Sequence, residues 1–113
     1  MNKFYNECYL RLMEQCIAAY YKKTIPIIYL IDNLEALTAA MKNISKAWKT
    51  AVAEEFHRMD VTYASMLDYG RESFTNYERE IFEKHIANIV VLIEQFKKEH
   101  TISTTTSPLI YPK

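Results

Sequence analysis

Residues 45–70 read SKAWKTAVAEEFHRMDVTYASMLDYG, and the last of them, Gly70, is the one glycine of the chain. Apolar residues recur along this stretch at helical spacing, which predicts a helix from about residue 46 to 69. Ser45 is a suitable N-cap, and Gly70 suits the position just after the helix end. The apolar residues expected on the inner face are Trp48, Val52, Phe56, Met59, Tyr63 and Met66.

The rest of the chain is equally poor in residues that form turns. One glycine and three prolines in 113 residues are too few for a β-rich fold. Helical patterns also cover about residues 3–22, 26–42 and 75–99, and the last begins with a capping-box pattern at Thr75 and Glu78. The sequence predicts an all-α, compact bundle of about four long helices. We expect this domain to span residues 1–100, and residues 101–113, rich in Ser, Thr and Pro, to form a short irregular tail.

Charge and composition exclude several classes of protein. The 14 basic and 14 acidic residues balance, so the basic excess typical of a nucleic-acid binder is missing. No apolar run is long enough for a membrane span, and the N-terminus lacks a signal-peptide pattern. Cys8 and Cys16 would lie about 12 Å apart on one helix, too far for a disulfide, so we expect two buried thiols. These features predict a cytoplasmic protein.

The first predicted helix has an apolar arc wider than a surface helix needs. This width fits a central helix, or a helix whose second apolar stripe forms the seam of a homodimer. The first stripe comprises Tyr5, Cys8, Tyr9, Leu12, Cys16 and Tyr20. The second stripe comprises Leu10, Met13, Ile17 and Tyr21.

Few residues suggest chemistry. Glu54 and His57 have the Glu-x-x-His spacing of di-iron bundles, but such a site needs two of these pairs and only one is present. His85 and Glu55 fall near the inner faces of their helices and either pair across the bundle or stay separate. Without a nucleophile or a phosphate-binding loop, we expect no catalytic residues, no metal, no cofactor and no enzymatic activity.

Nine tyrosines are many for this length, and tyrosine is common in protein interfaces. Some of them accompany acidic residues on the predicted outer faces, which indicates either a solvated surface or a docking site for a basic partner. The candidate contact residues are Tyr29, Asp32, Glu35, Asp60, Asp68 and Tyr69.

Residues 31–37 (IDNLEAL) and 56–68 (FHRMDVTYASMLD), with Trp48 between them and the capping box at Thr75, resemble small all-helical bacterial immunity proteins. These belong to toxin–immunity systems, including contact-dependent growth inhibition. The resemblance covers about residues 20–98, and the aromatic first helix and the Thr-rich tail depart from it. It implies a non-enzymatic protein that binds a cognate toxin in the cytoplasm and blocks its active site or substrate access. Many such toxins are nucleases with basic substrate sites, so the acidic candidates become expected toxin contacts.

Two other functions stay open at the level of sequence. One is a structural or regulatory helical homo-oligomer without catalytic activity, for which we expect a concentration-dependent dimer. The other is a helical enzyme or metal-binding protein, for which we expect bound metal and inward-facing carboxylates.

Overall fold

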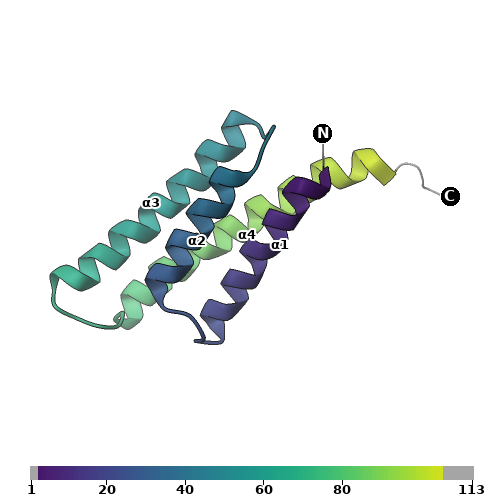
Figure 1. Ribbon diagram of the computed structural model, residues 1–113. Coiled ribbons are helices and arrows are strands. Elements are labelled where there is room, and N and C mark those ends of the chain that lie inside the picture. Colours follow the sequence, from purple (N-terminus) through teal and green to yellow (C-terminus); the bar gives the residue numbers. More distant parts are fainter. Residues whose placement is uncertain (1–2, 106–113) are drawn as a thin grey trace.

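The structure, a computed structural model, describes residues 3–105, with side chains from residue 5 to residue 99. Within this range the chain forms four α-helices and no strand (Figure 1). Their bounds are Lys3–Tyr21 for α1, Ile27–Ala40 for α2, Lys46–Asp68 for α3 and Asn76–Thr105 for α4. The predicted all-α bundle of four long helices is confirmed. Residues 106–113 of the predicted tail lie outside the described residues.

The end of α4 differs from the prediction. We placed it near Glu99, with irregular chain from Thr101, but the helix continues to Thr105. No glycine or proline occurs between Gly70 and Pro108. Serine and threonine each cost a helix only about 0.7 kcal/mol or less relative to alanine, so nothing stops the helix at residue 100. The expected boundary between bundle and tail therefore falls inside a helix.

The four helices form a ring around one core. α1 packs against α2, α2 against α3, α3 against α4, and α4 against α1. The chain therefore places sequence neighbours side by side and closes the ring with its first and last helices (Figure 1). The largest fully buried side chains include Leu10, Met13, Leu30, Leu34, Met59, Phe82 and Ile89.

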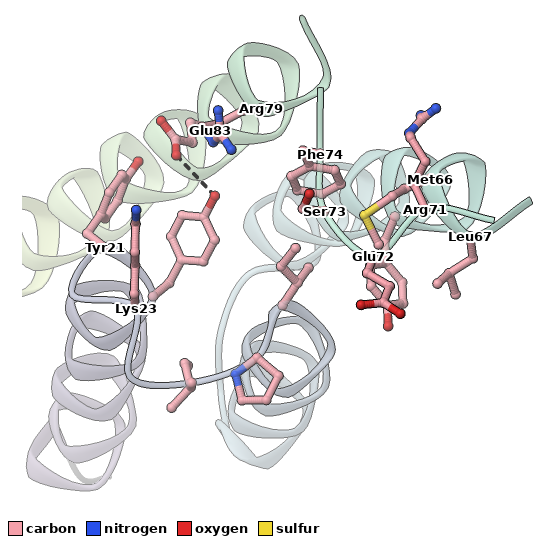
Figure 2. Close-up of a pocket in the computed structure, with 15 residues that line it drawn as sticks. Tyr21, Lys23, Met66, Leu67, Arg71, Glu72, Ser73, Phe74, Arg79 and Glu83 are labelled. Atoms are coloured by element: carbon pink, nitrogen blue, oxygen red, sulfur yellow. Dashed lines mark hydrogen bonds between the residues drawn. The ribbon is translucent and has the colours of Figure 1, made fainter. Parts of the chain in front are cut away.

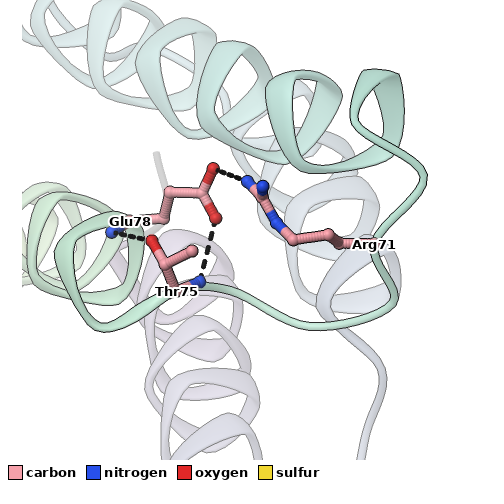
Figure 3. Close-up of polar contacts among 3 residues, drawn as sticks. All are labelled: Arg71, Thr75 and Glu78. Carbon is pink, nitrogen blue, oxygen red and sulfur yellow. Dashed lines mark hydrogen bonds and ion pairs between the residues drawn. The ribbon is translucent and has the colours of Figure 1, made fainter.

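The ends of α3 and α4 carry the predicted local signals. The Ser45 hydroxyl accepts a hydrogen bond from the Trp48 N–H at 3.0 Å. The Thr75 hydroxyl accepts from the Glu78 N–H at 3.1 Å, while the Glu78 carboxylate accepts from the Thr75 N–H at 2.9 Å and pairs with Arg71 (Figure 3). Gly70 follows α3 with a φ of +72°, which a residue without Cβ adopts at little cost. These caps and this turn set how α4 returns along α3.

The position of α1 bears on two predictions. Leu10, Met13 and Ile17 of the second stripe are buried within one chain, which favours the central-helix alternative, whereas Tyr21 of the same stripe is 50% exposed. The three buried residues face α2 and α4, and the wide apolar arc reflects a helix with two neighbours. Cys8 is exposed, contrary to the expected burial, because it lies on the outer side of α1. A homodimer through α1 stays a prediction.

Candidate binding surface

Three carboxylates gather on the outer side of the α2–α3 pair. Asp32 and Glu35 lie one turn apart on α2, and Asp60 comes from α3. Partial burial raises the pKa of the Glu35 carboxyl, and the nearby charges of Asp60 and then Asp32 raise it further. The two helices thus bring like charges close enough to repel each other. We call Asp32, Glu35 and Asp60 the acidic cluster.

The carboxylates of the acidic cluster have no ion-pair partner among the described side chains. Within residues 5–99 none of the three takes part in an ion pair. Some carboxylates elsewhere in the bundle do have partners, as where the Lys97 ammonium donates to Glu14 at 2.6 Å. Negative potential on the α2–α3 face is therefore left open to solvent or to a partner molecule.

The other three candidate residues lie at or near one end of the α2–α3 pair, where α2 begins and α3 ends. Tyr29 is 59% exposed and lies one turn before Asp32 on α2. Tyr69, which is 74% exposed, and Asp68 are at the C-terminal end of α3, eight or more residues beyond Asp60. The guanidinium of Arg71 stacks over the Tyr69 ring at 5.1 Å. Asp68 and Tyr69 therefore belong to the end of the bundle rather than to the acidic cluster.

A groove opens at that end, where the α1–α2 and α3–α4 connections meet, and sequence reasoning missed it. Its volume is about 790 Å³. Figure 2 shows Arg79 and Glu83 of α4 on one side and Met66 and Leu67 of α3 on the other, with Phe74 between them. We call it the loop-end groove, and its apolar lining includes Ile25, Ile27, Tyr63, Met66, Leu67 and Phe74.

The polar side of the loop-end groove is held by a hydrogen bond. The Tyr20 hydroxyl donates to the Glu83 carboxylate at 3.0 Å. Burial raises the pKa of Tyr20, and the hydrogen bond to Glu83 and its charge raise it further, so the phenol stays protonated as a donor. Arg79 donates to the side-chain oxygen of Asn76 at 3.1 Å. These charges are engaged within the chain.

The His and Glu residues that suggested chemistry either pair between two helices or lie on an exposed helix face. His85 Nδ1 and a Glu55 oxygen are 2.8 Å apart, and Asn88 also donates to Glu55 at 3.2 Å. The pairing across the α3–α4 interface that the sequence left open is therefore present. Glu54 and His57 lie on the exposed side of α3. Among the described residues, no three His, Cys, Asp or Glu side chains gather closely enough to hold a metal ion.

Comparison with known proteins adds no assignment. No protein-family model, curated protein or solved structure matches this chain. From residue 3 to residue 105, no helix has both the length and the apolar character that crossing a membrane requires.

Proposed function

We propose that this protein is an immunity protein that binds a basic toxin domain, a nuclease, through the acidic cluster on α2 and α3. The observation that carries the proposal is the convergence of Asp32, Glu35 and Asp60 from two helices without a cation to balance them. The resemblance of residues 20–98 to helical immunity proteins supports the same role. The protein would act in the cytoplasm, where the toxin meets its nucleic-acid substrate.

The chemistry of a nuclease explains why carboxylates would inhibit it. A nucleic-acid-binding site holds phosphates with lysine and arginine side chains. Carboxylates presented on packed helices compete for these cations and keep the phosphates away. Opposite charges also speed the encounter of two proteins, which suits a protein that must capture its toxin early. Exposed Tyr29 beside the acidic cluster adds contact area of the kind common in interfaces.

The test is isothermal titration against the C-terminal domain of whichever protein the gene upstream of this one is found to encode. The variant carries Asp32→Asn, Glu35→Gln and Asp60→Asn, which keep the size of each side chain and remove its charge. We expect affinity to fall about 10- to 100-fold at low salt, and the loss to shrink at high salt because rim charges are screened.

A matched control changes net charge by the same amount elsewhere. Glu54→Gln, Glu80→Gln and Glu99→Gln remove three exposed carboxylates outside the acidic cluster. We expect this control to bind like the wild type. Equal losses in both variants would reduce the effect to net charge and contradict a defined acidic site. Absence of any binding by the wild type would contradict the immunity role toward that partner.

A further inference from the structure

We propose that the loop-end groove receives an apolar side chain of the same basic partner, and that this contact adds affinity that salt does not screen. The inference rests on the proposed function, because it assigns a second contact to the same partner. It commits the groove to one occupant: a protein segment in which an aliphatic or aromatic side chain is flanked by lysine or arginine.

The lining of the groove suits an apolar guest. Met66 and Phe74 are almost fully buried beneath it, whereas Leu67 on its wall is 51% exposed. A leucine left half in water gains free energy when a partner covers it. Tyr21, on the α1 side of the same groove, is 50% exposed. Exposed apolar and aromatic side chains around a hollow are typical of interface residues that carry much of the binding energy.

The groove and the acidic cluster lie on the same pair of helices. On α2, Ile27 lines the groove and Asp32 lies five residues further on, about 7.5 Å along the helix axis. On α3, Leu67 lines the groove and Asp60 lies seven residues earlier, about 10 Å away. A partner interface of ordinary size, about 800 Å² on each protein, spans both features.

Charge determines which apolar segment fits. Arg71 pairs with Glu78, and the opposite charges of Arg79 and Glu83 lie one helical turn apart on α4, so these groove charges offset each other. The remaining charges of the lining, Lys23 and Glu72, cancel. Asp68, next to Leu67 on α3, and the acidic cluster further along α2 and α3 are exposed carboxylates that take part in no ion pair. An apolar side chain between lysines or arginines therefore complements this surface, and one between carboxylates meets repulsion.

The experiment uses the full chain and the same upstream-encoded domain as the titrant. Leu67→Ala shortens an exposed groove wall, and Ser73→Trp fills the groove from its exposed rim. We expect each to weaken binding about tenfold, equally at low and high salt, whereas the acidic-cluster variant loses its effect at high salt. Val91→Ala, at a 52% exposed site on α4 outside the groove lining, is the matched control and should bind like the wild type.

The outcomes separate the two proposals. Normal affinity for both Leu67→Ala and Ser73→Trp, with weak binding by the acidic-cluster variant, overturns the groove assignment and leaves the proposed function standing. No binding by the wild type overturns the proposed function together with the groove contact. A groove variant that instead abolishes self-association of the free protein in light scattering shows that a second copy is the occupant, which also overturns the proposal. Far-ultraviolet circular dichroism confirms that each variant keeps its helices.

Discussion

Carboxylates have different surroundings where α1 meets α4 and where α2 meets α3. At the α1–α4 interface, Glu14 accepts a hydrogen bond from Lys97 at 2.6 Å and Glu83 accepts one from Tyr20 at 3.0 Å. At the α2–α3 interface, Glu35 has Asp32 and Asp60 as its charged neighbours. Carboxylates between α1 and α4 thus have hydrogen-bond donors as partners. Carboxylates on α2 and α3 instead have each other as neighbours.

This difference distinguishes carboxylates that stabilise the fold from carboxylates that are available to bind a partner. A paired carboxylate helps to hold two helices together, although exposed pairs contribute less than about 1 kcal/mol. Like charges on neighbouring helices oppose the packing that creates them, so they give the folded state no benefit. A surface that lowers stability in this way is where a functional demand is expected. The three predictions below test the contrast in order of decreasing effect.

The substitution with the largest expected effect on stability removes a side chain from the core that the helices share. Phe82 of α4 is fully buried, with its ring centroid 5.5 Å from that of Tyr20 and 4.9 Å from that of Phe74. Phe82→Ala should lower the free energy of unfolding by about 3–5 kcal/mol, because it removes a large core side chain and leaves a cavity. Urea unfolding followed by circular dichroism measures the change. Tyr77→Ala, at a 72% exposed site on the same helix, is the control and should stay within about 0.5 kcal/mol of the wild type.

The second prediction concerns the paired interface itself. Tyr20→Phe removes the hydroxyl that donates to Glu83 but keeps the ring. We expect a loss of about 1 kcal/mol in the free energy of unfolding, because a partly buried carboxylate loses its donor. Tyr21→Phe is the control next to it, since Tyr21 is half exposed and should lose almost nothing. Equal thermal midpoints for Tyr20→Phe and the wild type would mean that water replaces the lost donor and that this pairing does not stabilise the α1–α4 interface.

Sequence reasoning predicted the parts of the fold that depend on near neighbours. Ser45, Gly70 and the Thr75–Glu78 capping box act within a few residues, so their positions in the chain determine their contacts. The inner face of α3 follows from the helical period in the same way. Where local signals are weak, as beyond Glu99, the predicted helix end was wrong.

The candidate site depends on which helices pack against each other. The pattern of apolar residues within each helix does not show this. Asp32 and Glu35 share a helix turn, but Asp60 joins them only because α2 packs against α3. The loop-end groove combines side chains from all four helices and both loops, including Tyr20, Leu67 and Phe74. The one local sign of such a hollow in a helix pattern was Leu67, an apolar residue outside the predicted inner face of α3.

Neutralising one carboxylate at each interface should change the free energy of unfolding only slightly, and in opposite directions. Glu35→Gln should raise the free energy of unfolding at pH 7 by a few tenths of a kcal/mol, because it removes repulsion that solvent already screens. Glu14→Gln, the matched control, should lower it by about 0.5 kcal/mol, because Lys97 loses the closer of its two carboxylate partners and keeps only Glu94.

The pH dependence identifies the negative charge of Glu35, disfavoured by partial burial and then by its carboxylate neighbours, as the cause of this gain. The folded protein raises the pKa of Glu35 above its ordinary value of 4.5, so the folded state holds this proton more tightly than the unfolded state. Ionisation of Glu35 therefore lowers the free energy of unfolding as the pH rises from the ordinary pKa to the folded pKa. Above the folded pKa the free energy of unfolding stays lower. The advantage of Glu35→Gln over the wild type should be full at pH 7 and absent below the ordinary value. Urea unfolding of both proteins at pH 7 and pH 4 measures this difference. A variant that is less stable than the wild type at pH 7 would mean that Glu35 has a stabilising partner, and the contrast between the two interfaces would then be wrong.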